Sequence, residues 1–523
     1  MKSRFLLFFS LFGLALTLHA QNQAPVLSNL SASADWAALS LTLSYDVSDA
    51  ENDAVDIQLQ VSNNGGDTYQ LNVPASGDLG YPVTPGPGKS ITIDLSSLSG
   101  MTGPFTVRVV ADDQQPFDYQ SLVNAVDSNR LRSDLEFVEG IRHRTGGPAH
   151  LAATQDSLRN CFTDAGLFMH EQTFTYQNYT GRNITGTHRG TSSGEQVVIV
   201  DAHYDSVINA PGADDNGSGT VGVMEIARLI SQYPTRKTVR MIGFDLEEAG
   251  LVGSLRYVQS GIQPNEDIIG VYNFEMIGYY SDEPNTQDVP TGFNQLFPAA
   301  YSEIQSNQFR GNFLINVGNF ESLPFGTEFE TLATQYVPGL SVISIFPPGN
   351  SEIAPDLRRS DHARFWDAGY DALMLTDGAD FRNNCYHTPM DTLEKLNFTF
   401  MSNVVKATLV AAAVKAEIQH GDWATVTFQG ATGTTNPNTD CQFVLYPRPD
   451  GTIFLATERC PWRDVAVEIF DAKGSMVYQQ TVNLSNSPDG REYLQLPSPL
   501  DAGVYMVKIS GEFGSVVRKM LIP

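Results

Sequence analysis

The stretch EQVVIVDAH (195–203), followed by GTVGVMEIARLISQY (219–233), decides the fold of the central part of this chain. The first segment is an apolar run that ends in polar residues, as in a strand buried on both faces, and the second has the length and apolar spacing of a helix. Further strand-like runs follow at 238–248, 268–278 and 371–379, with helical sequence after the first of them. Strands and helices alternating in this way predict an α/β fold, with a mainly parallel sheet and helices on both faces.

Two strand-rich regions flank this α/β part. Before it, alternating strands such as LSLTLSYDVSD (39–49) and FTVRVVADD (105–113) are separated by Gly, Asn, Asp and Pro turns, which predicts a small β-sandwich. After it, VAVEIFDAKGSMVYQQTV (465–482) and LDAGVYMVKISGEFGSVVRKMLIP (500–523) predict a second sandwich. The expected division is a first sandwich at 21–113, an α/β domain at 118–421, and a linker with the second sandwich at 422–523.

The first residues have the form of a signal peptide. Lys2 and Arg4 precede an apolar run at 5–18, and the small residue Ala20 comes before a polar change, so residues 1–20 are expected to be removed on export. The run of about 14 apolar residues is shorter than the roughly 20 that cross a bilayer. No later segment is expected to be long and apolar enough to do so, and the mature chain is therefore expected to have no membrane span.

The charge of the chain argues against one class of partner. The 523 residues include 59 acidic and 32 basic side chains, which gives a formal net charge of −27. Affinity for a phosphate backbone depends on Lys and Arg displacing counterions, and the sequence has no basic cluster for this purpose. We therefore expect no nucleic acid among the partners.

Four cysteines, Cys161, Cys385, Cys441 and Cys460, are an even number in a chain that is expected to be exported. Disulfides are permitted in that compartment. Pairing Cys161 with Cys385 and Cys441 with Cys460 would keep each bridge within one expected domain. Four cysteines allow three pairings, however, and the sequence does not choose between them.

Polar residues of one chemical kind follow the predicted strands. In open α/β sheets ligands bind at the carboxyl ends of the strands, so these side chains are expected to meet at one edge. Histidine and carboxylate donors suit zinc, and a pair of metals would share one carboxylate and a bridging hydroxide. Two Zn²⁺ would balance three carboxylates and that hydroxide. The residues are His203 and Asp205, Asp215 within GADDNGSG (212–219), Glu247 and Glu248, Glu275, and His387.

Each of these residues also has an ordinary structural interpretation. GADDNGSG could be a turn that caps the helix beginning near Val221, and His203 could be a core histidine. Glu247 and Glu248 could begin a solvated helix, and His387 could be structural. All of these would have to coincide in the right order along the chain, which favours the metal site.

Six motifs, in order, carry a resemblance to a known family: HYD, GADDNGSG, EEAGLVGS, NFEMIG, RSDHARF and YHTPMDT. They resemble the zinc-dependent exopeptidases, which include secreted bacterial aminopeptidases and glutamate carboxypeptidase II. The resemblance implies one zinc on His203, Asp215 and Glu275, and a second on Asp215, Glu248 and His387. It also implies a general base at Glu247, an orienting carboxylate at Asp205, an oxyanion donor at Tyr386 and a substrate contact at Arg359.

The function implied is that of a secreted zinc aminopeptidase, which hydrolyses N-terminal residues of peptides through the metal-bridging hydroxide. NFEMIG has Glu275 where the related aminopeptidases have aspartate, so recognition of the substrate amine is less securely implied than metal binding. A carboxypeptidase, or a glutaminyl cyclase with a single zinc, would share the fold. A surface binding protein with an inactive core is the alternative from another class.

The two flanking regions carry resemblances of their own. The strand GVYMVKI (503–509) and the final strand with Arg518 and Lys519 resemble the C-terminal sorting domain of the type IX secretion system. This implies that the secretion machinery is a partner and that the protein is secreted or held at the cell surface; a generic binding module is the alternative. The turn VSNNGGDTYQ (61–70) resembles a fibronectin type III module in the first sandwich.

Overall fold

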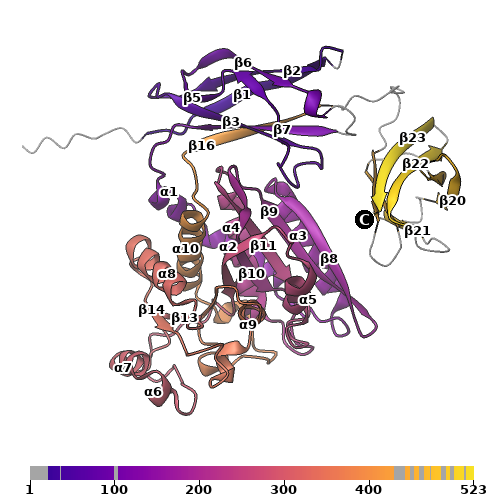
Figure 1. Ribbon diagram of the computed structural model, residues 1–523. Helices are drawn as coiled ribbons and strands as arrows, with labels where there is room; N and C mark the ends of the chain where they lie inside the picture. The colour runs from indigo at the N-terminus through magenta and orange to yellow at the C-terminus, as the bar shows by residue number, and fades with distance from the viewer. Residues whose placement is uncertain are drawn as a thin grey trace, which may run out of the picture.

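The computed structural model describes most of the chain between residues 22 and 522. The described ranges are 22–35, 37–98, 104–428, 442–447, 453–458, 464–471, 473–483, 491–494, 500–511 and 514–522. Residues 1–20, where the signal peptide is expected, lie outside these ranges. A group of strands, a central body of helices around a sheet, and a second group of strands follow one another along the chain (Figure 1).

Two four-stranded antiparallel sheets form the first β-sandwich, with strand orders β1-β2-β6-β4 and β16-β7-β3-β5. Alternate residues of each strand face the space between the sheets, so that Leu41, Leu43 and Ile91 are fully buried. The resemblance to a fibronectin type III module stays a prediction. The strands are β1 (Val26–Asp35), β2 (Ser40–Ser48), β3 (Val55–Ser62), β4 (Ala75–Gly77), β5 (Gly80–Val83), β6 (Gly86–Asp94), β7 (Phe105–Asp112) and β16 (Gly421–Phe428).

Strand β16 belongs to this first sandwich although it follows the central domain in the chain. It pairs antiparallel with β7 along its whole length, from Gly421 opposite Asp112 to Phe428 opposite Phe105. The rings of Phe105 and Phe428 stack with their centroids 5.2 Å apart. The C-terminal region expected to start at 422 therefore begins inside a strand of the first sandwich. The segment GDWATVTF alternates like a half-buried strand, and this alternation does not specify its distant partner β7.

An eight-stranded mixed sheet forms the central body, in the order β14-β13-β15-β12-β10-β11-β9-β8. Strand β10 is parallel to β11 and β12, β12 is parallel to β15, and β13 is parallel to β14. The pairs β13–β15, β11–β9 and β9–β8 are antiparallel. The predicted α/β fold with a largely parallel sheet is confirmed. The strands are β8 (Phe168–Tyr176), β9 (Tyr179–His188), β10 (Ser193–His203), β11 (Lys237–Phe244), β12 (Asp267–Phe274), β13 (Leu314–Gly318), β14 (Val342–Ile345) and β15 (Ala372–Thr376).

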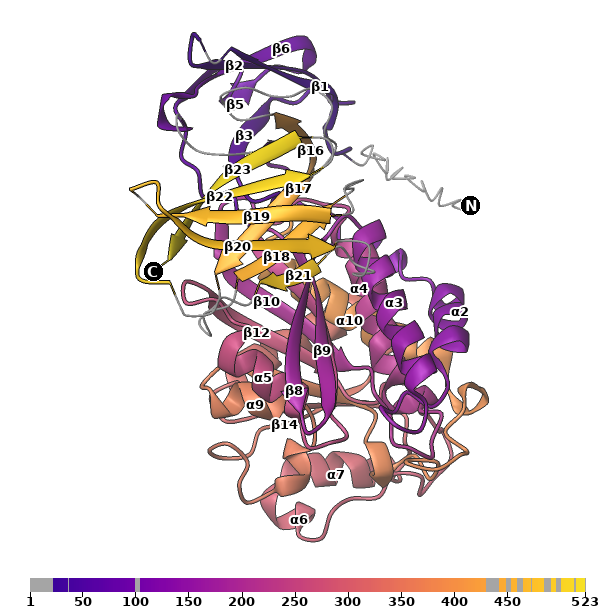
Figure 2. The same cartoon turned by 90° about the vertical axis from the view of Figure 1, so that its right-hand side faces the viewer.

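Helices cover both faces of this sheet (Figure 2). Alternate residues of β10 mark the two layers: Val198 and Val200 pack in a core with α2, α3, α4 and α10, whereas Val197 and Ile199 pack with α5 and α9. The sheet is therefore buried on both sides, as its apolar strands require. The helices are α1 (Tyr119–Asn124), α2 (Ser128–Val138), α3 (Pro148–Asp164), α4 (Gly219–Ile230), α5 (Val252–Ser260), α6 (Phe293–Leu296), α7 (Pro298–Ser306), α8 (Leu323–Tyr336), α9 (His362–Asp367) and α10 (Phe398–Lys415).

Helix α10 meets the length and composition of a membrane span, which corrects the expectation that no segment after the leader does so. It has 18 residues and a mean hydropathy of 1.2, but 72% of it is buried inside the structure. Its side chains, such as Val404, Leu409 and Ala412, contribute to the same core as α4 and α8. Core helices of globular proteins pass the same test, and burial on nearly all sides accounts for its apolar sequence.

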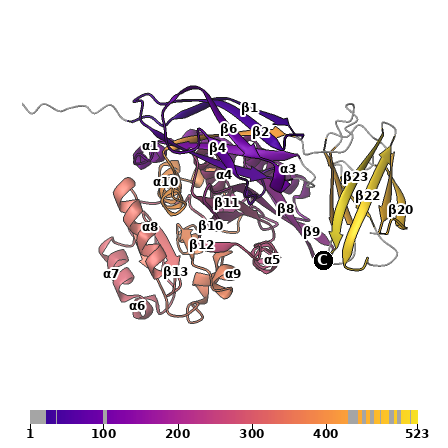
Figure 3. The same cartoon turned by 45° about the horizontal axis from the view of Figure 1, so that its top comes forward.

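The C-terminal strands form two further antiparallel sheets, in the orders β17-β18-β21 and β20-β19-β22-β23 (Figure 2). Figure 3 shows β20, β22 and β23 of the second of these sheets from another side. They share a core in which Leu455, Val467, Ile469 and Val507 are fully buried. The second sandwich predicted for this region is therefore present in the described residues. The strands are β17 (Gln442–Pro447), β18 (Ile453–Glu458), β19 (Asp464–Phe470), β20 (Met476–Asn483), β21 (Arg491–Leu494), β22 (Gly503–Gly511) and β23 (Gly514–Ile522).

The structure removes one of the considered disulfides. Cys161 on α3 and Cys385 in the loop before His387 are both free thiols, so they are not paired with each other. The Cys161 thiol is buried, with Sγ 3.6 Å from the carbonyl oxygen of Met224. Cys441 and Cys460 lie outside the described residues.

Candidate metal centre

The residues predicted to bind metal follow the carboxyl ends of neighbouring strands. His203 is the last residue of β10, and Glu275 comes directly after β12. Glu248 follows β11 by four residues, and His387 lies in the loop after β15. Because β11, β10, β12 and β15 are consecutive parallel strands of the sheet, these four side chains meet at one edge of it.

Asp215 reaches the same edge from the turn Ala213–Ser218, between β10 and α4, in which Asp215 and Asn216 have non-helical backbone angles. Asn216 fixes this turn to β12: its Nδ2 donates to the carbonyl oxygen of Phe274 at 2.7 Å, and its Oδ1 accepts from the N–H groups of Gly219 and Met276. Gly212 enters the turn with φ of +61°, and a Cβ there would lie 2.2 Å from the carbonyl oxygen of Asp215. The glycine and the asparagine thus shape the backbone around Asp215.

The two carboxylate oxygens of Asp215 lie near two different histidines. Oδ1 is 3.4 Å from Nε2 of His203, and Oδ2 is 3.0 Å from Nε2 of His387. Nε2 of His203 also lies 3.4 Å from Oε2 of Glu275, and Nε2 of His387 lies 3.3 Å from Oε2 of Glu248. The geometry therefore brings all five sequence-predicted ligands together, with Asp215 between the two histidine sites.

Glu247 lies beside the His203 site. Its Oε2 is 3.9 Å from Nε2 of His203. By mutual distance, His203, Glu247 and Glu275 form one group of donor atoms within 4.8 Å of one another, and Asp215, Glu248 and His387 form a second such group. The Glu247 carboxylate is therefore close enough to the His203 group to contact a metal ion bound there. It is also placed to accept a proton from a water molecule beside that ion.

The donor atoms fit divalent metal ions. Nε2 of His203, Oδ2 of Asp215 and Oε1 of Glu248 are buried and have no hydrogen-bond partner within the described part of the chain. Buried polar atoms are rarely left in this state, and those of a metal site are satisfied by the ion. Imidazole nitrogens and carboxylate oxygens are ligands that zinc accepts.

The raised pKa values of the buried glutamates also indicate a site for divalent cations. Burial, together with the neighbouring Asp215 carboxylate, raises the pKa of Glu248 to about 7. Burial, together with the charge of Glu275, also raises the pKa of Glu247 well above its ordinary value. Crowded buried carboxylates are costly without compensating positive charge, which divalent cations would supply.

Asp205 links the histidine of one site to the glutamate pair. Its Oδ1 accepts a hydrogen bond from the backbone N–H of Glu247 at 3.0 Å, and its Oδ2 accepts one from Glu248 at 3.3 Å. Oδ1 also lies 3.5 Å from Nδ1 of His203, and the carbonyl oxygen of Asp205 lies 3.2 Å from the same nitrogen. Its position fits the predicted role of orienting the imidazole, and it also fixes the backbone that carries Glu247 and Glu248.

Tyr386 and Arg359 lie together beside His387. The Tyr386 ring stacks on the His387 imidazole with centroids 3.8 Å apart. Arg359 Nη2 donates to the Tyr386 hydroxyl at 3.1 Å, and Arg359 Nη1 lies 3.1 Å from Oδ1 of Asp380. The hydroxyl and the guanidinium are therefore both next to the donor groups, as their predicted roles require.

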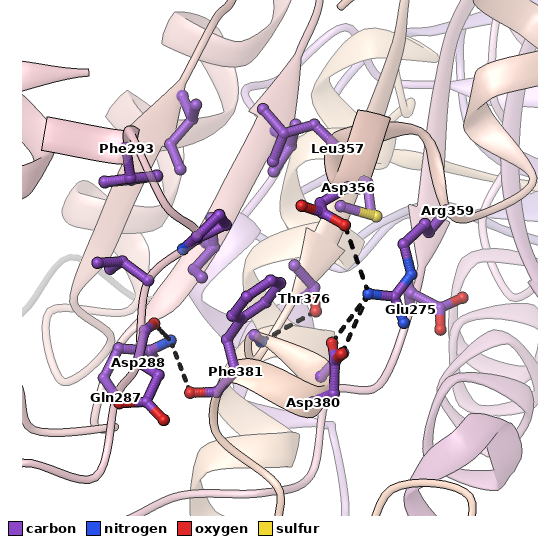
Figure 4. Close-up of a pocket in the computed structure, with 18 of the residues that line it drawn as sticks. Glu275, Gln287, Asp288, Phe293, Asp356, Leu357, Arg359, Thr376, Asp380 and Phe381 are labelled. Atoms are coloured by element: carbon purple, nitrogen blue, oxygen red, sulfur yellow. Dashed lines mark hydrogen bonds and ion pairs between the residues drawn. The ribbon is translucent and has the colours of Figure 1, made fainter. Parts of the chain in front are cut away.

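A mostly apolar pocket opens beside Glu275 and Arg359 (Figure 4). Its cavity volume is about 70 Å³. In the close-up Arg359 is joined to Asp356 and Asp380 at the mouth, while Phe293 and Leu357 form part of the wall. The remaining apolar lining comes from Val289, Pro290, Ile304, Ile315, Val317, Ile345, Met374, Ala379 and Phe381.

Three buried residues near the centre were not singled out from the sequence. The Ser360 hydroxyl donates to Oε2 of Glu275 at 2.7 Å, and the Asp391 carboxylate accepts from the backbone beside Asp215. Arg142 donates to the carbonyl oxygens of Tyr204, Pro211 and Gly212, and so joins the end of β10 to the start of the Asp215 turn. Ser360 and Asp391 stand within the quoted motifs RSDHARF and YHTPMDT, whereas Arg142 stands in none of them.

Comparison with known proteins identifies the family of the chain. Residues 183–412 match peptidase family M28, and residues 444–523 match a secretion system C-terminal sorting domain. The chain is 30% identical over 312 residues to the uncharacterized protein YfbL of Escherichia coli (strain K12), which covers 55% of this chain and 90% of that protein. The chain belongs to peptidase family M28.

Several named relatives are aminopeptidases. The chain is 30% identical over 227 residues to aminopeptidase YwaD of Bacillus subtilis (strain 168), with 42% of each protein covered. Among solved structures it is similar to BSAP, a zinc aminopeptidase from Bacillus subtilis, with 25% identity, a TM-score of 0.35, and 46% of this chain and 52% of that chain covered. The chain thus spans about half the length of these two proteins or less. Its sorting domain is of the kind that directs a protein out of the cell.

Proposed function

We propose that the chain is an exported aminopeptidase that uses two zinc ions to remove N-terminal residues from peptides. The observation that carries this proposal is the position of Asp215, whose two oxygens lie 3.4 Å and 3.0 Å from Nε2 of His203 and of His387. One carboxylate between two histidine sites is the arrangement that a pair of metals requires. His203 and Glu275 would hold one ion with Asp215, and Glu248 and His387 would hold the other.

The zinc ions would polarise the scissile carbonyl and lower the pKa of the attacking water. Glu247, beside His203, accepts a proton from that water and passes it to the leaving amine. Burial raises the pKa of Glu247, which suits a group that takes up a proton and then releases it. The Tyr386 hydroxyl donates to the oxyanion, and the adjacent Arg359 guanidinium keeps positive charge next to that hydroxyl.

The apolar pocket supports recognition of the first side chain of the substrate. It begins at Glu275, which belongs to the His203 site, and its walls are formed by aliphatic and aromatic residues. A side chain placed there would leave its own carbonyl carbon near the donor groups and its amine near Glu275. We therefore infer that peptides beginning with an apolar residue are preferred, since a charged side chain would lose its hydration on entering.

The experiment is hydrolysis of aminoacyl amides that begin with Leu, Met, Phe, Gln, Glu or Lys, each compared with its N-acetylated form. The proposal expects cleavage of the free amines, with the apolar residues first. Cleavage of the N-acetylated compounds at equal rates would contradict an aminopeptidase and favour an amidase or endopeptidase, which needs no free amine. Conversion of N-terminal glutamine to a ring, without hydrolysis of any amide, would favour a glutaminyl cyclase.

The type IX secretion machinery is the proposed partner of the C-terminal domain, and peptides are the proposed partners of the centre. The match of residues 444–523 to a sorting domain supports the first of these. A chain that ends at Phe428 lacks this domain and should be retained inside its native host. Finding it outside the cell in normal amounts would contradict the proposed partner.

A further inference from the structure

Asp391 is fully buried beside the turn that carries Asp215, although it belongs to neither group of donor atoms. Its Oδ1 accepts a hydrogen bond from the backbone N–H of Asp214 at 3.0 Å, and its Oδ2 accepts one from that of Asp215 at 3.1 Å. Its own carbonyl oxygen accepts from the N–H of Ala213 at 3.2 Å. One residue thus binds three successive N–H groups of the turn.

The chemistry of this contact calls for a carboxylate. Two neighbouring N–H groups that point the same way need two acceptor oxygens, and an ionised carboxylate supplies both with stronger hydrogen bonds than a neutral group would make. An amide of the same size supplies one acceptor and turns an NH₂ group toward the other N–H. Asparagine at position 391 would therefore keep the volume and lose one side of the contact.

The place of Asp391 in the chain ties the two donor groups together. It stands four residues after His387, in a short loop closed by a hydrogen bond from its N–H to the carbonyl oxygen of Thr388 at 3.1 Å. One end of this loop carries the histidine of the second donor group, and the other end holds the backbone of the carboxylate that both groups share. Arg142 holds the opposite side of the same turn, through the carbonyl oxygens of Pro211 and Gly212.

We propose that Asp391 is a positioning residue, which keeps the carboxylate of Asp215 between His203 and His387 by fixing the peptide backbone of the turn. The proposal rests on the proposed function, because it concerns the same metal centre. Asp391 acts through the N–H groups of Asp214 and Asp215 and touches neither substrate nor metal. Without it the turn can rotate, and the two oxygens of Asp215 no longer face both histidines at once.

The test compares the full wild-type chain with Asp391→Asn. Zinc affinity is measured by competition with a chromogenic chelator, and the visible absorption of the cobalt-substituted protein is recorded. Loss of a group that orients a metal ligand typically lowers affinity by about 10–100-fold, and we expect a decrease of that size together with a changed cobalt spectrum. The matched control is Asp112→Asn, which removes an equally buried carboxylate that accepts from Gln419 and Arg236 far from the centre. The control should leave metal affinity and the cobalt spectrum unchanged.

The outcomes separate this inference from the function on which it rests. A wild-type chain that binds no zinc would contradict the proposed function itself. A wild type with two zinc ions, and an Asp391→Asn variant with the same affinity and the same cobalt spectrum, would overturn the positioning role alone. If Asp391→Asn fails to fold, Asp391→Glu keeps the charge but moves the oxygens by one methylene. Wild-type affinity in that variant would equally overturn the role.

Discussion

Two adjacent glutamates, Glu247 and Glu248, have different neighbours at this centre. Oε2 of Glu248 lies 3.3 Å from Nε2 of His387, whereas Oε2 of Glu247 lies 3.9 Å from Nε2 of His203. Their backbone N–H groups are both held by the Asp205 carboxylate. Neighbours in the sequence therefore face different donor groups, which supports the proposed roles of Glu248 in metal binding and of Glu247 in proton exchange.

Glu247→Gln should retain its metal and lose most of its turnover. The amide keeps the size of the side chain but cannot accept a proton, and a general base contributes about 10²–10⁴-fold to a rate. Metal content and kcat are measured on the same preparation, with Glu394→Gln as a control at an exposed acidic residue. A Glu247→Gln enzyme with a tenth of the wild-type kcat would show that another group is the base.

At this scale the sequence could predict the ligands but not all of the residues that orient them. His203, Asp215, Glu248, Glu275 and His387 stand at strand ends or in a glycine-rich turn, and the family resemblance implies how they would share two metals. Ser360 and Asp391 act on Glu275 and on the Asp215 backbone through contacts between loops far apart in the chain. Both residues stand within the quoted motifs RSDHARF and YHTPMDT, but their contacts depend on how the loops pack, which the motifs do not specify.

Among the elements, the parallel strands position the residues of the site, and β16 connects the C-terminal end of the central domain to the first sandwich. The apolar runs of β10, β11, β12 and β15 could be recognised in the sequence, because strands buried on both faces are continuously apolar. Strand β16 could be recognised as a strand, but its partner β7 lies about 300 residues earlier in the chain. Register over that separation is decided by tertiary packing, and the domain boundary predicted at 422 missed it for that reason.

Truncation on either side of β16 should have different consequences. A chain ending at Phe428 keeps all of β16 and should hydrolyse peptides as the full chain does, since every proposed ligand precedes it. A chain ending at 420 leaves β7 as an unpaired edge and removes Phe428, whose burial alone is worth about 1.5–3 kcal/mol. Thermal unfolding and hydrolysis are measured for both chains. Equal melting temperatures would mean that β16 does not stabilise the sandwich.

For the whole molecule, the first sandwich is bound to the peptidase body by buried polar contacts. Arg108 on β7 donates to the carbonyl oxygens of Arg189 and Gly190, each at 2.8 Å. Gln60 on β3 donates to the carbonyl oxygen of Thr191 at 2.7 Å. Together with β16, which returns the chain to the sandwich after α10, these contacts join the two parts into one body.

His188, at this junction, should make the molecule sensitive to acid. Burial, followed by the charge of Arg108, lowers the pKa of His188 to about 4, and its Nε2 lies 2.9 Å from the carbonyl oxygen of Tyr233. An unfolded histidine takes up its proton near pH 6.5, so the unfolded state binds more protons between pH 6.5 and 4. The contribution of His188 to the free energy of unfolding is therefore fully present above pH 6.5. It decreases by roughly 3 kcal/mol as the pH decreases toward 4.

The check is chemical unfolding of the wild type and of His188→Gln across that range of pH. Glutamine keeps a donor for the Tyr233 carbonyl oxygen but does not titrate, so the variant should lose less stability than the wild type between pH 6.5 and 4. Parallel pH profiles for the two proteins would show that His188 is not the group responsible.

The central claim is a centre for two metals that share Asp215, and metal stoichiometry tests it most directly. Zinc per chain is determined by elemental analysis on active, unchelated protein, for the wild type and for Asp215→Ala and Asp214→Ala. Asp214 is equally buried, but its carboxylate accepts from the Gly278 N–H and the Asn383 amide and belongs to neither donor group. The account predicts two zinc ions in the wild type and a greater loss from Asp215→Ala than from Asp214→Ala. One zinc ion or none in active wild-type protein would contradict it.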